Sequence, residues 1–404
     1  MPNKPAKPSL EHLARLTDET GLIQHAKFII PDRFNGYCTD DNARAAIAMV
    51  KYLKKYPAEP QGPKLFEIYL SFLYHALKAD KTVHNFMDYS RNWKSDEPVG
   101  DALGRTIWAF GSIIASPPDN AYVPVVREFF EDASNHIPQM SPRGMAYSIL
   151  GQVECLARFP DAKETKETLA FAADRLVEHY KKHSTADWNW FEDILSYDNA
   201  ILPAALFAAA SALNDKTTSK NVIARSPSGT TKQSDCHSGE SRNLHTATAW
   251  AKSPPYKRDC HAPKGLAMTS SISEDTHKYL EVAEKTCKFL LDNIYNGTHF
   301  SFIGAVGWYP KGKTRAQFDQ QPIEVASTVL MLKAAYEATG DKEYLSLQKK
   351  AFDWFFGEND LRMAVYDSKT NGCCDGIGDG GVNINQGAES IVSFLLALLT
   401  LSQN

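Results

Sequence analysis

Two kinds of helix-forming segment alternate along the chain. The first kind is charged and amphipathic, and in residues 163–183 its apolar stripe runs through Leu169, Ala172, Ala173 and Leu176. Because the other faces of such a helix carry charge, we expect it to be buried on one side and exposed on the other. Segments of this kind are 64–79, 122–133, 163–183, 276–294 and 342–356.

The second kind of segment is apolar on nearly every side and rich in small residues. Residues 199–213 and 390–401, for example, contain no charged side chain. A helix that is apolar all round is buried between other layers, so this kind predicts an inner set of helices. Segments of this kind are 39–54, 101–116, 142–158, 198–213, 322–338 and 386–401.

The order of the two kinds predicts a ring. Buried and exposed segments follow one another strictly, and residues 9–15 can supply a sixth exposed helix. With residues 216–270 set aside, a buried segment begins about every 60 residues, which is the length of one helical hairpin. An open array is the alternative, but its last helix should be polar outside, and residues 390–402 are strongly apolar. We therefore predict an all-α, single-domain (α/α)6 toroid over residues 8–404.

Composition narrows the class of protein further. The chain has 404 residues, 43% hydrophobic and 23% charged, which suits a large folded core. A net charge of −4 argues against a nucleic-acid partner. The longest apolar runs are too short for a membrane span, and residues 1–8 contain no apolar signal-peptide core. Seven irregularly spaced cysteines indicate reduced thiols, so we expect a cytoplasmic protein.

Residues 216–270 differ from the rest of the chain. They contain nine Lys or Arg and three Asp or Glu, a net charge of +6, and no apolar period. We interpret them as a basic, low-order insertion between an inner and an outer helix, without a function of its own. The pairs Cys236-His237 and Cys260-His261 do not follow the spacing of a zinc site, so no metal is predicted there.

Polar residues gather where each buried segment begins. The leading sequences are NGYCTDDNAR, SDEPVGDALGR, SPRG, WNWFEDILSYDNAILP, FDQQPIE and VNINQGAES. In a ring these six helix starts share one face. Some of the polar residues are helix caps, as Ser141 before Pro142 is. The others exceed what capping requires and predict a site.

Paired carboxylates beside aromatic rings favour a carbohydrate site, since rings pack on the apolar face of a sugar and polar groups bind its hydroxyls. One acid and one base or nucleophile can then cleave a glycosidic bond. We favour Asp41 and Glu192 as the catalytic pair, with Asp40 and Asp193 in support. Glu192 would be the acid, because burial beside Trp190 and Phe191 would raise its pKa. Other aromatic candidates are Tyr37, Trp93, Trp108, Trp308, Tyr309 and Tyr366.

The motifs GYCTDDNAR, SPRG, WFEDILSYDNAILP, FDQQPIE and NINQGAES, in this order, resemble a bacterial family with a six-hairpin-glycosidase-like (α/α)6 domain. Its members are sometimes fused to, or identified as, glycosyltransferases. The resemblance spans most of residues 10–402 outside the insertion, although SDEPVGDALGR departs from the family's pattern and leaves the role of Asp101 open. It implies an oligosaccharide or glycoside substrate and allows association with a glycosyltransferase. Matched positions and the aromatic residues beside them give the expected substrate-binding set: Tyr37, Arg44, Arg105, Trp190, Tyr197, Asp198, Asn199, Gln321, Glu324, Gln386 and Glu389.

Three functions remain open from the sequence. The first is glycosidic-bond hydrolysis or phosphorolysis with paired carboxylates. The second is a sugar epimerase or isomerase, which would need histidines, and His25, His84 and His299 lie outside the six motifs. The third is a glycan-binding module without catalysis, accessory to a glycosyltransferase. No cofactor is expected, because the glycine-rich residues 372–381 lack the context of a phosphate loop.

Overall fold

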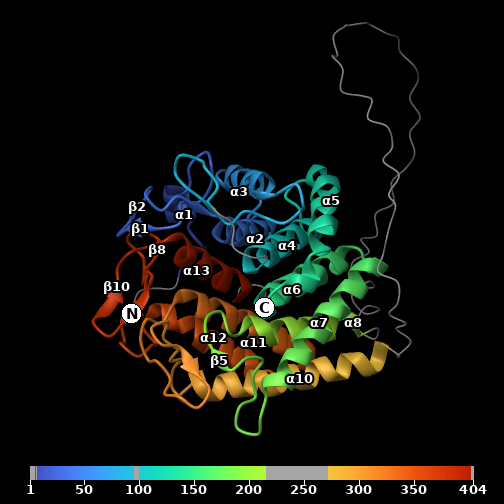
Figure 1. The fold of residues 1–404 in the computed structure, drawn as a ribbon. Coiled ribbons are helices and arrows are strands. Elements are labelled where there is room, and N and C mark those ends of the chain that lie inside the picture. The colour runs from blue at the N-terminus through green and yellow to red at the C-terminus, as the bar shows by residue number, and fades with distance from the viewer. Residues whose placement is uncertain (1–4, 6, 95–99, 215–271, 402–404) are drawn as a thin grey trace, which may run out of the picture.

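Six inner helices form a closed ring in the computed structural model, which describes residues 5, 7–94, 100–214 and 272–401 (Figure 1). Each inner helix packs against the next, and the last packs against the first. The inner helices are, in order around the ring, α2 (Thr39–Lys55), α4 (Asp101–Ala115), α6 (Pro142–Arg158), α8 (Ile201–Leu213), α11 (Pro322–Thr339) and α13 (Ala388–Leu401).

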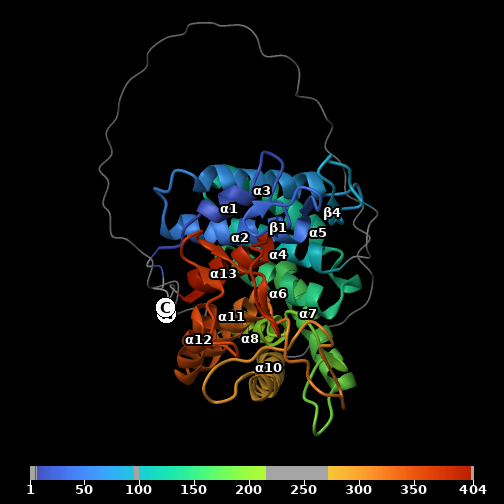
Figure 2. The same cartoon turned by 90° about the vertical axis from the view of Figure 1, so that its left-hand side faces the viewer.

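Among the described residues, six outer helices surround this ring, and several of them lie outside it in the view of Figure 2. Five pack against the inner helix that precedes them, whereas α1 packs against α13. The two ends of the described chain therefore build the sixth hairpin together. This confirms the predicted (α/α)6 toroid, including the role of the N-terminal helix. The outer helices are α1 (Glu11–Leu16), α3 (Gly62–Ala76), α5 (Val123–Ser134), α7 (Lys163–His183), α10 (Ile272–Ile294) and α12 (Glu343–Asp353).

Burial follows the two predicted classes of helix. Residues Leu103 to Ile114 of α4 are all buried, as expected of an inner helix. In α7 only one stripe is buried, and it contains the predicted Leu169, Ala172, Ala173 and Leu176 together with Val177. Most of the apolar contacts join into one large core that extends between the inner and outer layers, and a small second cluster comprises Ile23, Tyr37, Phe72 and Met87. Burial of this surface is the main favourable contribution to the stability of the ring.

The closest approach between neighbouring inner helices is the seam of α4 and α6. Gly104 and Gly111 on α4 lie against Gly144 and Gly151 on α6. A Cβ atom added to Gly104 would meet the Gly144 carbonyl oxygen at 2.4 Å, which no side chain tolerates. Glycine at these positions lets two backbones touch and brings the starts of α4 and α6 together.

Every strand among the described residues lies in a connection that leads into an inner helix. Each is two or three residues long and pairs with one antiparallel partner. The pairs are β1 (Ala26–Lys27) with β2 (Ile30–Pro31), β3 (Tyr37–Cys38) with β4 (Phe86–Met87), β5 (Ile194–Leu195) with β6 (Tyr309–Pro310), β7 (Tyr366–Asp367) with β8 (Gly372–Cys373), and β9 (Gly376–Gly378) with β10 (Gly381–Asn383). These pairs tie the long connections together over the face where the inner helices begin.

The predicted insertion, 216–270, lies outside the described residues. The described chain stops after the end of α8 and resumes at the start of α10, so this segment follows the far end of an inner helix. Cys38, Cys155, Cys287, Cys373 and Cys374 are buried and free of disulfide bonds. None of the helices in the described ranges is long and apolar enough to cross a membrane.

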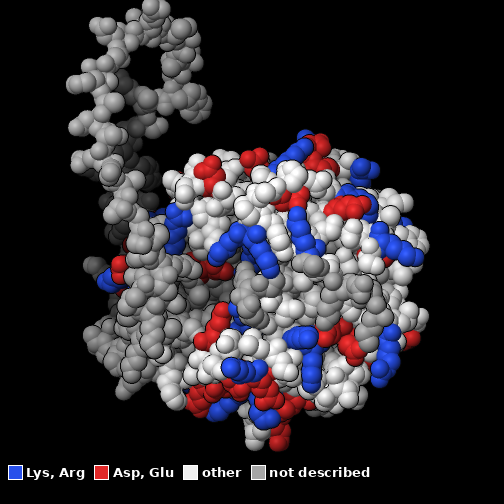
Figure 3. Space-filling model, turned by 180° about the vertical axis from the view of Figure 1, so that it is seen from behind, with Lys and Arg blue, Asp and Glu red and all other residues white. Residues whose placement is uncertain are grey.

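The surface carries both signs of charge. On the face shown in Figure 3, lysines and arginines lie interspersed with aspartates and glutamates over the described residues.

Candidate functional site

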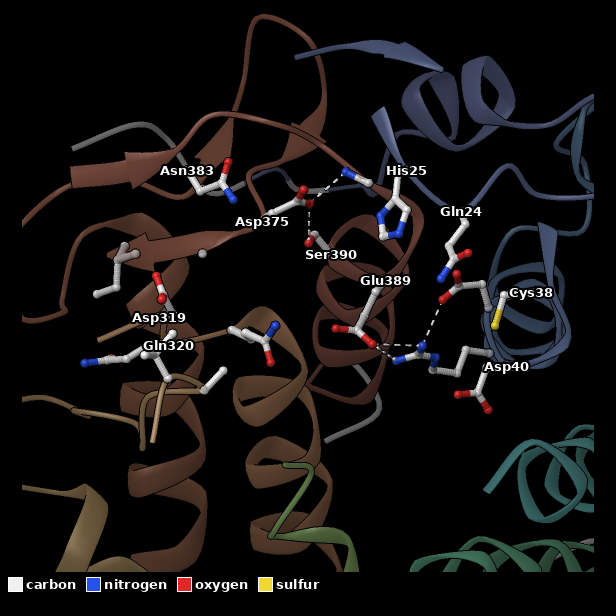
Figure 4. Close-up of a pocket in the computed structure, with 18 of the residues that line it drawn as sticks. Gln24, His25, Cys38, Asp40, Asp319, Gln320, Asp375, Asn383, Glu389 and Ser390 are labelled. Atoms are coloured by element: carbon white, nitrogen blue, oxygen red, sulfur yellow. Dashed lines mark hydrogen bonds and ion pairs between the residues drawn. The ribbon is translucent and has the colours of Figure 1, made fainter. Parts of the chain in front are cut away.

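A cavity of about 570 Å³ opens at the face where the inner helices begin. Figure 4 shows Asp319 and Gln320 on one side of it, Cys38 and Asp40 on the other, and Glu389 between them. The cavity is lined by side chains from α2 and α13 and from the connections that precede α2, α4, α11 and α13: Gln24, His25, Cys38, Asp40, Asp41, Arg44, Phe86, Ala305, Val306, Asp319, Gln320, Gln321, Asp375, Gly376, Ile377, Asn383, Gly387, Glu389 and Ser390.

Arg44 joins two carboxylates in this cavity. Its Nη2 donates to Oδ1 of Asp41 at 2.8 Å and to Oε2 of Glu389 at 3.0 Å. Asp41 is only 2% exposed. Burial, followed by the nearby charges of Glu389 and Asp40, raises its pKa to about 7 despite the charge of Arg44. Asp41 can therefore hold a proton near neutral pH.

Asp40, the neighbour of Asp41, has the opposite electrostatic environment. Burial opposes its charged form, but the charges of Arg105 and Arg44 and a hydrogen bond from Arg105 lower its pKa below the ordinary value. Nη1 of Arg105 donates to Oδ2 at 2.5 Å. The other oxygen, Oδ1, is buried and has no hydrogen-bond partner in the described structure. Asp40 is thus a carboxylate that the two arginines keep ionised.

Arg105 is the centre of a buried polar network inside the ring. It is 1% exposed and contacts Asp40, the hydroxyl of Tyr147 and Oδ2 of Asp198, the last at 3.1 Å. The Tyr147 hydroxyl also donates to Asp198. This network links the starts of α2, α4, α6 and α8, so it fixes where the Asp40 carboxylate lies.

Glu324 supports the segment that leads into α8. Its carboxylate accepts the backbone N–H groups of Asp198 and Asn199 and the side-chain amide of Asn199. Asp198 has a left-handed backbone with φ of +48°, which is strained for a residue other than glycine. Burial, followed by the charge of Asp198, raises the pKa of Glu324 to about 8. These three predicted substrate-binding residues are buried and do not line the cavity.

The second predicted carboxylate pair lies apart from the first. Glu192 accepts a 2.7 Å hydrogen bond from Nη1 of Arg143, and neither residue lines the cavity. Asp193 is exposed and pairs with His183 and Lys311. The structure therefore brings Asp40 and Asp41 together but leaves Glu192 and Asp193 outside their cavity.

The predicted aromatic residues are mostly part of the core. Trp190 is 0% exposed and packs against Phe191 and Phe289, and Tyr37 is 1% exposed and donates its hydroxyl to Asp18. Both lie in the protein interior rather than at the cavity, because a large ring gains most by full burial. The lining likewise lacks Trp93, Trp108, Trp308, Tyr309 and Tyr366.

The remaining predicted residues divide between the cavity and its support. Arg44, Gln321 and Glu389 line the cavity. Tyr197 lines an adjoining hollow, described below. Gln386 is buried and accepts a hydrogen bond from Thr370 at 2.9 Å, which fixes the turn before α13.

Several lining residues are absent from the sequence-based prediction. Phe86 supplies the aromatic ring, His25 lies exposed at the cavity, and Asp375 accepts hydrogen bonds from Gly387 N–H and Ser390, both at 2.8 Å. Burial raises the pKa of Asp375. All three belong to long connections without helical periodicity, so the pattern of apolar residues gave no signal for them.

The other two candidate histidines lie away from the cavity. His84 stacks on Trp93, and His299 pairs with Asp360 at 2.8 Å, so neither lines the cavity. Within the ranges that the structure describes, no group of three or more His, Cys, Asp or Glu side chains is placed to hold a metal ion.

Comparison with known proteins reveals likeness in structure and not in sequence. No family model and no curated protein matches the chain. A sugar epimerase from a ruminal bacterium superposes with a TM-score of 0.65 at 9% identity, over 98% of this chain and 95% of that one. Cellobiose 2-epimerase from Bacillus thermoamylovorans gives 0.62 at 11% identity, over 96% and 95%.

A hydrolase shares the same architecture. The GH76 α-mannanase BT2949 of Bacteroides thetaiotaomicron superposes with a TM-score of 0.58 at 9% identity, over 97% of this chain and 93% of that one. At these identities the likeness shows the fold, and the chain therefore has the (α/α)6 toroid architecture of these enzymes.

Proposed function

We propose that this protein hydrolyses a glycosidic bond, with Asp41 as the general acid and Asp40 as the base or nucleophile. The observation that carries the proposal is that two adjacent carboxylates line one cavity and have pKa values shifted in opposite directions. Environments that separate two carboxyl groups in this way assign the acid and the base. Asp41, with a pKa near 7, would protonate the leaving oxygen.

The surroundings of Asp40 support its part in the reaction. Arg105 holds Oδ2, and the Asp40 side chain is 19% exposed, so the ionised carboxylate can act as a base toward water or as a nucleophile toward the anomeric carbon. Phe86 offers a ring for the apolar face of a sugar, and Gln24, Gln321 and Asn383 offer amides for its hydroxyls. Neighbours of the same fold act on sugars according to their names, which agrees with this chemistry.

Glu192 does not suit the acid's role that its aromatic neighbours suggested. Its carboxylate lies outside the cavity and accepts a hydrogen bond from Arg143, which also donates to the Tyr197 carbonyl at 2.6 Å and to the Ser196 hydroxyl. Glu192 and Arg143 together brace the turn before α8. We therefore propose Asp40 in place of Glu192 as the partner of Asp41.

A sugar epimerase or isomerase is the second candidate, and His25 favours it. This histidine is exposed at the cavity and lies close enough to Asp375 to act on the pKa of that carboxyl, which it lowers. An imidazole near neutral pH can remove and return a proton beside a sugar carbonyl. The mannose isomerase among the structures of this fold, at 10% identity and a TM-score of 0.59, makes this candidate worth testing.

One assay separates the two candidates. The wild-type protein is incubated with α-mannan fragments, cello-oligosaccharides and free mannose, and products are resolved as shorter glycans or as isomers. Asp41→Asn should abolish hydrolysis while glycan binding is retained, and His25→Gln and Glu192→Gln should retain hydrolysis. Isomerisation that is lost in His25→Gln and kept in Asp41→Asn would overturn the proposal in favour of the second candidate.

A further inference from the structure

A second hollow adjoins the main cavity at Asp40. It has a volume of about 400 Å³ and lies at the starts of α4 and α6, whereas the main cavity lies toward α11 and α13. Its lining includes Asp40, Asn85, Asp101, Ala102, Ser141 and Tyr197, and we call it the Tyr197 hollow. Asp40 is the one side chain that borders both spaces in the described structure.

The connection before α4 separates the two spaces. Asn85 lines the Tyr197 hollow, whereas the next residue, Phe86, lines the main cavity. The Asn85 carbonyl accepts the Thr39 N–H at 2.8 Å, and β4 pairs with β3, so this divider is fixed to the start of α2. A ligand that occupied both spaces would therefore pass directly over Asp40.

Each space contains the same kinds of group. The main cavity has the ring of Phe86 with carboxylates such as Asp375, and the Tyr197 hollow has the ring of Tyr197 with the carboxylate of Asp101. Asp101 accepts the Ser141 hydroxyl at 2.7 Å. An aromatic ring with a few fixed polar groups is the arrangement that binds one sugar unit, so two spaces provide for two units.

Two buried arginines lie beside the Tyr197 ring, and one of them also holds Asp40. The guanidinium carbon of Arg143 lies 5.2 Å from the centre of the ring, and that of Arg105 lies 5.9 Å from it. Arg105 also holds Asp40. The distance between the second ring and Asp40 is therefore fixed by a buried side chain rather than by a loose surface contact.

We propose that the Tyr197 hollow binds a further sugar unit of a linear glycan, so that the substrate spans Asp40 with one unit in the main cavity and the next beyond it. This inference rests on the proposed function for the bond that is cleaved, but glycan binding tests it independently of turnover. It predicts a preference for glycans of two or more units over monosaccharides, because a single unit fills only one of the two spaces.

Equilibrium binding tests the proposal. Calorimetry would measure the affinity of α-manno-oligosaccharides and cello-oligosaccharides of one to six units for the wild type and for Asp41→Asn, which prevents turnover. Affinity should rise about tenfold or more between one unit and two or three units. Ala102→Trp, which fills the Tyr197 hollow from α4, should remove this rise, and Asn85→Ala should reduce it severalfold. Tyr74→Ala, an exposed aromatic on the outer helix α3, is the matched control and should leave it unchanged.

Each outcome of the binding measurements either supports or overturns the inference. A length dependence that survives in folded Ala102→Trp and in Asn85→Ala would overturn the inference, and so would equal affinity of the wild type for one and three units. If Ala102→Trp does not fold, Asn85→Ala decides alone. Length-dependent binding that needs the Tyr197 hollow, without any hydrolysis, would uphold the inference and reject the proposed hydrolase. If no glycan of the series binds, both are rejected.

Discussion

The two ends of the ring differ in how their connections are built. Where inner helices begin, connections such as 295–321 and 354–387 carry the short strands, and every non-glycine residue with positive φ in the described ranges lies in a connection of this kind. At the other end, 159–162 and 340–342 are tight turns. Strained backbone persists only where the surrounding structure holds it in place. The strain therefore marks the end with the long connections as the end that carries the candidate site.

The larger of the cavities at the two ends does not lie at the end with the candidate site. A hollow of about 640 Å³ lies at the opposite end, between the turns that follow α2 and α4, and is larger than the main cavity. Its lining is rich in apolar side chains and proline: Leu53, Pro57, Pro63, Phe66, Pro117 and Pro118. What separates the two ends is buried charge. Among the described residues, only the first end combines adjacent carboxylates with arginines that are almost fully buried.

The largest expected effect follows from removing the charge that unites the first end. Arg105→Met should lower the free energy of unfolding by about 3–5 kcal/mol, because Asp40 and Asp198 would lose their buried partner. Arg158→Met at the opposite end, where the guanidinium caps the Ile114 carbonyl and contacts Asn120, is the control and should lower it far less. Denaturant unfolding measures both, and equal losses would mean that the network at the first end has no special weight.

The glycine seam between α4 and α6 runs along the two helices, so substitutions at its two levels should affect stability and glycan turnover differently. Gly111→Ala should lower stability by about 1–3 kcal/mol, because the new Cβ would meet the Gly151 carbonyl oxygen at 2.2 Å. Gly104→Ala, two turns nearer the carboxylates, should in addition reduce glycan turnover, since it displaces the helix that carries Arg105. Gly380→Ala, with open space around it, is the control. Thermal unfolding and turnover of Gly104→Ala that match those of wild type would contradict the seam's role.

The free energy of unfolding should depend on pH because of two buried carboxyls at the end where the inner helices begin. The pKa values of Asp41 and Glu324 are raised to about 7 and about 8, so the folded state binds protons more tightly than the unfolded chain. Their contribution is complete below about pH 4 and is lost as the pH rises through these values. Each such group changes the slope of the free energy of unfolding against pH by at most about 1.4 kcal/mol per pH unit. Glu324→Gln should flatten the slope between pH 6 and 8, in urea titrations at a series of pH values; an unchanged slope would argue against a buried, protonated Glu324.

The smallest effect is expected at the opposite end. Deletion of residues 217–270, which follow the far end of α8, should change neither the melting temperature nor glycan turnover by a measurable amount. The ring contacts of α8 and α10 are made by described residues outside this segment. Differential scanning calorimetry of the deletion variant is the check, and a marked fall in stability would show that the segment belongs to the ring.

The sequence predicted the ring closely because burial imposes a period on helices. The segments 142–158 and 163–183 match α6 and α7 to the residue, and residues 9–15 correspond to α1. Predictions failed where tertiary contacts decide: α8 starts at Ile201 instead of 198, since Glu324 binds the backbone of Asp198 in a turn.

The site was predicted only in part, for a physical reason. Helix starts place Asp40, Asp41 and Glu389 at one face, and these side chains do line the cavity. Helical periodicity does not tell which side of an irregular connection faces the ring axis. For this reason Trp190 was expected at the site but lies in the core, whereas His25 lines the cavity and was not among the expected site residues. The association with a glycosyltransferase stays a prediction.

The most direct test of the central claim is the rate of glycoside hydrolysis in matched variants of the two ends. Asp41→Asn and Asp40→Asn should each lower kcat by about 10²- to 10⁴-fold with the fold intact. Asp119→Asn, in the hollow at the opposite end, should retain the wild-type rate. Hydrolysis that survives in both site variants, or that falls equally in Asp119→Asn, would contradict the assignment of the chemistry to Asp40 and Asp41.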